Sequence, residues 1–257
     1  RVGVAVVDPQ ERADAHLVAR NREYTTYTGT LDGTRVSVEG IVDRVDLMEQ
    51  DGKKYVRVVD YKSGTKAFRL DDVYYGLNLQ MLIYLFSIWK NGRGELADCL
   101  PAGVLYLPAK DHIISTSREA TDEQVEREHQ KRYKMSGLVL EDPTCVAGME
   151  HEIAGVFIPV KTKSDGSFDA RSSLATLEQM GRIQRHIERV LSGMAQHLLD
   201  GQIEASPSVG MGYEPCQYCD YKPICQHQQQ DRQHKLTEMG RAGFFEALKE
   251  EEDGKTE

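Results

Sequence analysis

Two short apolar runs joined by a turn signal constrain this chain more than any other feature. Apolar and polar side chains alternate over residues 36–45, and residues 55–61 form a second, Val-rich run. A period of two is typical of strands with one buried face. Asp51-Gly52 lies between the runs and strongly indicates a tight hairpin turn. We therefore predict an antiparallel hairpin.

The hairpin carries three charged side chains in apolar surroundings. Asp43 lies on the first predicted strand, and Asp60 and Lys62 lie two residues apart near the end of the second, hence on one face. A buried carboxylate is costly unless it is paired or binds a cation. Two interpretations remain open from residue types. Lys62 is the structural ion-pair partner of Asp60, or the two acids hold a hard cation such as Mg²⁺ near a phosphate.

A largely apolar helical pattern follows the hairpin. We predict a helix from Val73 to about Lys90, with Asp71 or Asp72 as its N-cap. Gln80 and Tyr84 are four residues apart, so they share one helix face. Either both side chains point at the same site as the acids, or they lie on the exposed face of an amphipathic helix.

Three ordered motifs, G-x-x-D-R-V-D, D-Y-K-S and Y-Y-G-L-x-L-Q-M-x-x-Y, carry a specific resemblance. Together they resemble the nuclease domain of AddB-type subunits of bacterial AddAB helicase–nucleases, in the RecB-type branch of the PD-(D/E)xK nucleases. In that pattern Asp43 and Asp60 match the metal-binding acids and Lys62 the catalytic lysine. Gln80 and Tyr84 match the motif on the next helix. The resemblance implies an α/β fold, a small mixed β-sheet flanked by helices as in restriction endonucleases.

The resemblance also implies an activity and partners. We expect a Mg²⁺-dependent DNA exonuclease domain that acts in double-strand-break processing and recombinational repair, with the carbonyl of Tyr61 as a third metal ligand. DNA and an AddA-like helicase subunit, in a heterodimer, are the expected partners. The alternative is a catalytically silent scaffold that binds DNA or a protein, in which the acids and Lys62 form a relict ion pair.

Composition sets limits on this interpretation. The 257 residues carry a net charge of −9 and a pI near 5.5, which is unusual for a free-standing nucleic-acid binder. Lys62, Lys66 and Arg69 supply local positive charge, either for DNA or as a solvated cluster. No apolar run is long enough to span a membrane and no signal peptide is visible, so we expect a cytoplasmic protein.

The rest of the chain before residue 170 is less distinctive. The resembled family carries a His or Glu on a helix upstream of the first acid; His16 lies in a plausible helix, but we expect it to be an exposed helix residue. Residues 103–107 and 156–160 read as strands of the nuclease sheet, and residues 116–134 as a solvent-facing helix.

The longest helical pattern covers residues 172–200. Thr176 and Gln179 form a potential capping box at its start, and Gly201 is a natural C-cap. Three arginines lie off its apolar stripe and face either DNA phosphates or solvent: Arg182, Arg185 and Arg189.

A cysteine motif, C-x₂-C-x₅-C, lies near the C-terminus at Cys216, Cys219 and Cys225. Without secretion a disulfide framework is unexpected, and thiolates at this spacing suit Zn²⁺ or an iron–sulfur cluster. The resemblance favours a [4Fe–4S] cluster that closes the nuclease domain as a staple in a reducing compartment.

The fourth ligand of such a cluster is not identified. The resembled family places it upstream of the first acid, where this chain has no cysteine. Cys145 or His227 could substitute, although we expect Cys99 and Cys145 to be ordinary buried thiols.

The domain organisation follows from these features. We predict a nuclease domain over residues 1–205, a Cys-rich iron–sulfur segment over 206–230, and a C-terminal helix with a charged tail over 231–257. Phe244, Phe245 and Leu248 would dock the helix, and residues 249–257 are expected to be disordered.

Overall fold

The computed structural model describes residues 16–31, 34–64, 67–109, 117, 119–228 and 230–254, with side chains from Val38 onward apart from residue 39. Lys66 therefore lies outside the described residues. The chain forms two compact units. One contains most of the chain up to Phe68 together with Gln80–Gln184, and the other contains Arg69–Leu79 and the chain from Arg185 onward.

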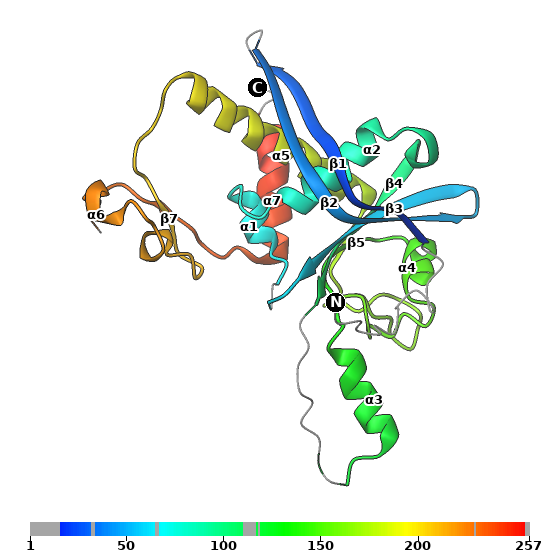
Figure 1. Ribbon diagram of the computed structural model, residues 1–257. Coiled ribbons are helices and arrows are strands. Elements are labelled where there is room, and N and C mark those ends of the chain that lie inside the picture. Colours follow the sequence, from blue (N-terminus) through cyan, green and yellow to red (C-terminus); the bar gives the residue numbers. More distant parts are fainter. Residues whose placement is uncertain are drawn as a thin grey trace. The chain divides into compact units, whose positions relative to one another are not determined.

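The first unit is built on a six-stranded sheet whose strands are arranged in sequence order (Figure 1). The β2–β3 and β4–β5 pairs are antiparallel, whereas β3–β4 and β5–β6 are parallel, so the predicted mixed sheet is confirmed. The strands are β1 His16–Leu31, β2 Thr34–Gln50, β3 Lys53–Lys62, β4 Cys99–Pro108, β5 Ser136–Leu140 and β6 Leu174–Ala175.

The predicted hairpin is the β2–β3 pair. Gln50 and Lys53 form its last register pair, so the turn contains only Asp51 and Gly52. Their φ angles are 51° and 72°, respectively. Two-residue turns with both φ angles positive match the twist of the adjoining strands, which is why Asp-Gly predicted this turn correctly.

The helix predicted from Val73 to Lys90 is two separate helices, α1 Leu70–Tyr74 and α2 Gln80–Asn91. Gly76 and Asn78 have φ angles of 76° and 54°, and these left-handed residues interrupt the helix. The capping prediction was also wrong. Arg69 is the N-cap of α1, and both Asp71 and Asp72 are buried inside its first turn.

Helix α2 covers part of the sheet and packs against β3 and β4 (Figure 1). The short η2 Gly94–Leu96 follows it and leads into β4. Apolar side chains of α2 and the two strands are removed from water and provide most of the stabilisation of this layer. Fully buried members are Val56, Val58, Leu82, Leu85, Val104 and Leu105.

Two more helices of this unit start at side-chain caps. Helix α3, Asp122–Lys131, is shorter than the predicted 116–134 helix because the capping box of Thr121 and Gln124 fixes its start. Helix α4, Pro143–Met149, begins at Asp142, whose carboxylate accepts from the Cys145 amide. None of the residues of α3 is buried, as expected for a solvent-facing helix.

Two of the predicted elements have a different structure. Residues 156–160 do not form a strand, because Glu150 accepts hydrogen bonds from the amides of Val156, Phe157 and Ile158 and so occupies donors that a ladder would need. The helix expected around His16 is instead β1, in a segment rich in Tyr and Thr, residues that favour strands.

The long helix α5, Leu177–Leu199, confirms the predicted caps. Thr176 Oγ1 accepts from the Gln179 amide at 3.1 Å, and Gln179 Oε1 accepts from the Thr176 amide at 3.0 Å. Gly201 has a φ of 67°, as a glycine C-cap requires.

The second unit contains α1, the C-terminal half of α5 and the end of the chain. Its small elements are β7 Ser208–Val209, η3 Pro215–Gln217, α6 Lys222–Cys225 and β8 His234–Lys235, followed by α7 Gly240–Asp253. As predicted, Phe244 and Leu248 dock the last helix, and both are fully buried.

Helix α7 extends into the segment expected to be disordered. Residues 249–253 are helical because their acids pair with α5. Arg185 Nε lies 2.6 Å from Glu252, and Glu251 contacts both Arg189 and the buried ring of His186. The prediction of disorder was therefore wrong for residues 249–253.

Within the described residues, no helix combines the length and the apolar composition that crossing a membrane requires.

Candidate active site

The two acids singled out from the sequence lie on neighbouring strands. Arg44 pairs with Val59 in the β2–β3 register, and continuing that register by one residue brings Asp43 opposite Asp60. Directly opposed residues of an antiparallel pair point to the same face. Oδ2 of Asp43 also accepts a hydrogen bond from the Tyr61 amide at 3.2 Å, which holds this carboxylate against β3.

Asp60 and Lys62 form the ion pair that was one of the two interpretations. Lys62 Nζ lies 2.5 Å from Asp60 Oδ2. Asp60 is 9% exposed, and its Oδ2 accepts no hydrogen bond within the described part of the chain. The side chain of Lys62 is 29% exposed, so the pair is open to solvent on the lysine side. A nearly buried carboxylate oxygen with a single ammonium contact retains capacity for a cation.

Tyr106 completes the surroundings of Lys62 and was not predicted. It is the register partner of Asp60 on β4, and its ring centroid lies 5.6 Å from Lys62 Nζ. This is within the range of a cation–π contact. The contact limits the positions that the lysine side chain can adopt, and only the parallel pairing of β3 with β4 creates it.

The first turn of α2 places Gln80 and Tyr84 beside β2. Gln80 Nε2 donates to Tyr84 Oη at 2.9 Å, as their spacing predicts. Tyr84 is buried, whereas Gln80 is exposed. A Cβ on Gly40 would lie 2.3 Å from Tyr84 Oη, so the tyrosine packs directly over the Gly40 backbone. The glycine of the G-x-x-D motif therefore makes room for the tyrosine of the next helix.

A third acid of the same motif, Asp46, has a different role. Its carboxylate is fully buried and binds Arg44 Nε at 2.7 Å and Arg57 Nε at 2.8 Å. Burial alone would lower the pKa of Arg44, but the hydrogen bond and charge of Asp46 raise it by more. Both oxygens of Asp46 are used by arginines, so this acid stabilises the sheet and leaves metal binding to Asp43 and Asp60.

The other basic side chains considered from the sequence pair with acids or carbonyls. Arg69 contacts Asp72, Glu238 and the Met211 carbonyl within the second unit. On α5, Arg182 pairs with Glu178 of the same helix, and Arg185 and Arg189 pair with α7. The alternatives of a free basic face and of DNA-facing arginines are replaced by these ion pairs.

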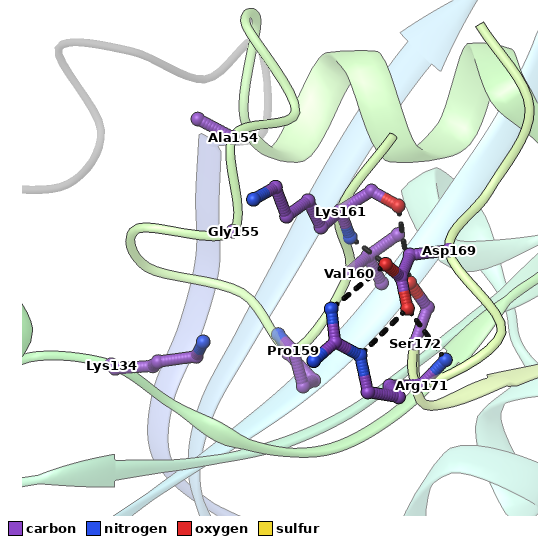
Figure 2. Close-up of a pocket in the computed structure, with 9 residues that line it drawn as sticks. All are labelled: Lys134, Ala154, Gly155, Pro159, Val160, Lys161, Asp169, Arg171 and Ser172. Carbon is purple, nitrogen blue, oxygen red and sulfur yellow. Dashed lines mark hydrogen bonds and ion pairs between the residues drawn. The ribbon is translucent and has the colours of Figure 1, made fainter. Parts of the chain in front are cut away.

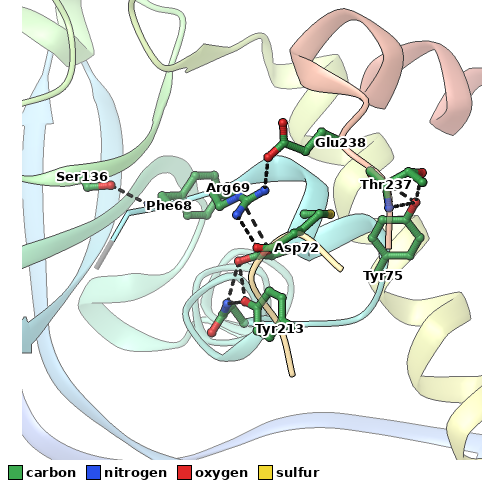
Figure 3. A network of polar contacts seen from close by, with 10 residues as sticks. Phe68, Arg69, Asp72, Tyr75, Ser136, Tyr213, Thr237 and Glu238 are labelled. Carbon is green, nitrogen blue, oxygen red and sulfur yellow. Dashed lines mark hydrogen bonds and ion pairs between the residues drawn. The ribbon is translucent and has the colours of Figure 1, made fainter. Parts of the chain in front are cut away.

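The second unit holds its C-terminal segment by a polar network that sequence reasoning missed (Figure 3). Tyr213 donates to Asp72 Oδ2 at 2.9 Å, and Asn78 donates to the same oxygen at 2.8 Å. Tyr75 Oη bonds to the hydroxyl of Thr237 at 2.9 Å. These contacts tie the segment that contains the cysteine motif to α1 of the same unit.

The cysteine motif is accessible to solvent. Cys216 is half-buried, and Cys219 and Cys225 are exposed with free thiols. The described residues hold no group of three or more His, Cys, Asp or Glu side chains arranged to bind a metal. The donor set suits a soft metal or a cluster, but these thiols do not form a preassembled site.

Cys99 and Cys145 are buried, as predicted. Burial raises the pKa of both thiols. Thiols of raised pKa stay protonated and are poor metal ligands at neutral pH. Neither residue is therefore suited to be the missing fourth ligand as it lies here.

The fit of a hard cation to the two aspartates rests on their oxygens. Asp60 Oδ2 lacks a hydrogen-bond donor, and Asp43 faces the same side of the β2–β3 pair. Two carboxylates with space for water and phosphate oxygens are a typical protein contribution to a Mg²⁺ site. The donor set at this position fits Mg²⁺.

Comparison with known proteins identifies the same class. The model of the PD-(D/E)XK nuclease superfamily matches residues 4–226, and the chain belongs to this superfamily. The α/β fold and the resemblance seen in the sequence are thereby confirmed.

Similar proteins in several bacteria are named as the B-type component of an ATP-dependent helicase/deoxyribonuclease. The protein of Clostridium acetobutylicum is 42% identical over 200 residues, which is 77% of this chain and 17% of that protein. Those of Acetivibrio thermocellus and Thermoanaerobacter sp. strain X514 are 35% identical over 210 residues (80% and 18%) and 33% identical over 223 residues (86% and 19%). The chain spans less than a fifth of the length of these relatives.

Proposed function

We propose that this chain is the Mg²⁺-dependent deoxyribonuclease domain of a longer helicase–nuclease subunit and cleaves DNA as an exonuclease. The observation that carries the proposal is the meeting of Asp43 and Asp60 on one face of the β2–β3 pair, with the Lys62 amine 2.5 Å from Asp60. Membership of the PD-(D/E)XK nuclease superfamily supports the reaction class.

Asp43, Asp60 and the carbonyl of Tyr61 would hold the ion. When bound there, Mg²⁺ lowers the pKa of a coordinated water and neutralises charge on a phosphate. The chain's own part is to fix the ligands. Asp43 is held by the Tyr61 amide, and Asp60 lies in a buried position with one oxygen free of hydrogen bonds. Rigid ligands reduce the reorganisation that the reaction requires.

Lys62 would position the attacking water and stabilise the developing negative charge of the phosphate. Its ammonium is oriented by Asp60 and by the Tyr106 ring, yet its side chain remains partly exposed and can reach a substrate. A preoriented ammonium at the reacting phosphate is electrostatic catalysis of a common kind.

Gln80 and Tyr84 would orient the substrate strand or the lysine. Their mutual hydrogen bond leaves the Gln80 carbonyl oxygen available, and Gln80 is on the exposed side. Tyr84 acts as the fixed base of this pair because it is packed over Gly40.

The wider role follows from the names of the relatives. We propose that the whole protein processes DNA double-strand breaks for recombinational repair in the cytoplasm, with an AddA-like helicase as partner in a heterodimer. The relatives are named as one component of a helicase/deoxyribonuclease, which supports both a DNA substrate and a partner chain.

The cysteine motif is proposed to bind a [4Fe–4S] cluster through Cys216, Cys219 and Cys225, with a fourth ligand from elsewhere in the longer protein. This staple would close residues 206–230 as a separate segment between a nuclease domain, 1–205, and a C-terminal helix, 231–257. Iron and sulfide content with visible absorbance after anaerobic purification tests it. Iron content unchanged in a Cys216→Ser, Cys219→Ser, Cys225→Ser variant would contradict it.

The test of the nuclease function compares two variants with a matched control. Asp60→Ala and Lys62→Ala should abolish Mg²⁺-dependent cleavage of labelled DNA, whereas Glu49→Ala, an exposed acid on the same β2 strand as Asp43, should cleave normally. Circular dichroism would verify that all three variants fold. Unchanged cleavage by Asp60→Ala would overturn the site.

The alternative, a catalytically silent scaffold, predicts a different result. In that case titration calorimetry of the unchanged chain with Mg²⁺ or Mn²⁺ would give no heat that depends on Asp43 and Asp60, and no condition would produce cleavage. Divalent binding lost in Asp60→Ala would exclude the scaffold.

A further inference from the structure

A basic pocket lies in the first unit, apart from the proposed active site (Figure 2). Its volume is about 470 Å³, within the usual range for ligand pockets. Segments from three parts of the chain line it, at Lys134, Ala154–Gly155, Pro159–Lys161 and Asp169–Ser172. The mechanism proposed above uses none of these residues.

The charges around the pocket are unbalanced. Among the described residues that line it, Lys134, Lys161 and Arg171 are cationic and Asp169 is the sole acid. Asp169 is already paired, because Arg171 NH2 lies 3.1 Å from its Oδ2 and Arg171 Nε donates to its Oδ1 at 3.1 Å. The ammonium groups of Lys134 and Lys161 have no acceptor among the described side chains and are exposed.

The walls of the pocket are held by buried hydrogen bonds rather than by surface contacts. Ser172 Oγ accepts from the Lys161 amide at 3.0 Å and donates to the Lys161 carbonyl at 3.2 Å. Glu150 binds three successive amides of the loop that leads into it. Because the backbone at Lys161 is fixed in this way, the cations are presented from a rigid frame, which lowers the entropy cost of binding.

Asp169 orients the guanidinium of Arg171 toward the pocket (Figure 2). The hydrogen bonds from the Arg171 side chain and amide lower the pKa of Asp169, so the carboxylate stays ionised at neutral pH. The guanidinium keeps unused N–H donors, since arginine has five and this pair uses two.

The pocket lies at the end of the sheet that carries the catalytic residues. Asp60 pairs in register with Tyr106, and Tyr106 pairs with Ser136. Each step between neighbouring strands is about 4.8 Å, so Ser136 is roughly 10 Å from Asp60. Lys134 precedes Ser136 by two residues. The pocket is thus a few nucleotides of extended strand away from the proposed cleavage position.

We propose that Lys134, Lys161 and Arg171 bind a backbone phosphate of the DNA strand outside the cleavage position. The inference rests on the proposed nuclease function for its substrate, but it concerns binding and not the chemical step. Phosphate contacts by lysine and arginine position a strand without reading its sequence. They also give an acidic chain, of net charge −9, a local path for a polyanion.

The test measures binding without cleavage. Fluorescence anisotropy of a labelled oligo(dT) strand, in EDTA and over a range of salt concentrations, compares the unchanged chain with a Lys134→Ala, Lys161→Ala variant. Loss of two phosphate contacts should reduce the slope of log K against log salt by about 1.4 and weaken binding roughly 10- to 25-fold near 0.1 M salt. Oligo(dA) should show the same loss.

Two controls separate this site from a general charge effect. Lys53→Ala removes the same charge from the start of β3, at the other end of that strand from Lys62, and should bind like the unchanged chain. Lys134→Arg, Lys161→Arg keeps the charge and should retain binding. Equal loss in Lys53→Ala, or no loss in the double alanine variant, would overturn the inference.

A last arm distinguishes a strand from a free nucleotide. Thymidine monophosphate at the same phosphate concentration should not displace the oligonucleotide, because a single contact pair lacks the other phosphates of the strand. Full displacement would assign the pocket to a free nucleotide and overturn the proposal.

The nuclease function and the phosphate site fail independently. If the double alanine variant binds normally while Asp60→Ala abolishes cleavage, only the pocket assignment falls. If the double variant loses binding while the unchanged chain never cleaves, only the nuclease proposal falls. When both hold, the double variant should show a raised KM with an unchanged kcat.

Discussion

The backbone amide of Tyr61 donates to Oδ2 of Asp43 at 3.2 Å, across the β2–β3 pair. This hydrogen bond joins an acid from one strand to the residue that lies between Asp60 and Lys62 on the next. The three motif residues are thereby held together by main-chain pairing, and their relative positions depend on the register that the two-residue turn sets.

Two acids of the same strand should respond in opposite ways to loss of charge. Asp43→Asn should abolish divalent binding and cleavage with little change in stability. Asp46→Asn leaves two buried arginines without their partner, which should cost about 3–5 kcal/mol in the free energy of unfolding. Urea unfolding and calorimetry with Mn²⁺ measure both quantities. Equal destabilisation by the two variants would contradict this division of roles.

Lys62→Gln should separate ion binding from catalysis. The variant keeps both carboxylates and removes the ammonium that lies against Asp60 Oδ2. We expect divalent affinity to be kept or increased, because no cation then competes for that oxygen, while the cleavage rate falls at least about a hundredfold. Calorimetry and a single-turnover cleavage assay check the two parts. Loss of ion binding would show that Lys62 only supports the acids.

Gly40→Ala should disturb the site through Tyr84. The new methyl would lie 2.3 Å from Tyr84 Oη, so the ring must move. We expect a loss of about 1–3 kcal/mol in stability and a lower cleavage rate. The double variant Gly40→Ala, Tyr84→Phe lacks the closest atom and should recover part of the stability. Thermal unfolding measures this recovery, and additive losses in the double variant would contradict the contact.

Tyr55 should make stability sensitive to alkaline pH. Burial, together with the nearby charge of Asp142 and the hydrogen bond to it, raises its pKa from 10.0 to about 12. Because the fold favours the protonated phenol, this contribution is complete below pH 10 and is lost as the pH rises to 12. A shift of this size corresponds to roughly 2–3 kcal/mol.

The measurement for Tyr55 is a difference between two proteins. Tyr55→Phe should be slightly less stable at neutral pH, since it loses the hydrogen bond to Asp142, but its stability should fall less steeply between pH 10 and 12. Urea unfolding across this range compares them. Parallel curves would mean that Tyr55 does not titrate with unfolding.

Local sequence signals were sufficient for the elements whose geometry is local. The Asp51-Gly52 turn, the Thr176 capping box and the Gly201 C-cap depend on residues within a few positions, and each has the predicted conformation. The alternation around Asp43 likewise placed it on a strand. In these places backbone preference and hydrogen bonding are decided by the chain itself.

Elements that depend on distant partners could not be predicted in this way. Residues 156–160 are as apolar as a strand, but Glu150 binds their amides. Residues 249–253 are charged like a disordered tail, but α5 supplies matching arginines. Periodicity does not contain such contacts, because they arise only when separate segments meet.

The sequence by itself determined the family, the hairpin with its acids and lysine, and the spacing of Gln80 and Tyr84. Tertiary structure decided which acid is free to bind a metal, since Asp43 and Asp46 differ only in what the neighbouring strand presents to them. It also gathered Lys134, Lys161 and Arg171 around one pocket from three separate segments. The physical reason is that charges become a site only when folding fixes their distances and their exposure to water.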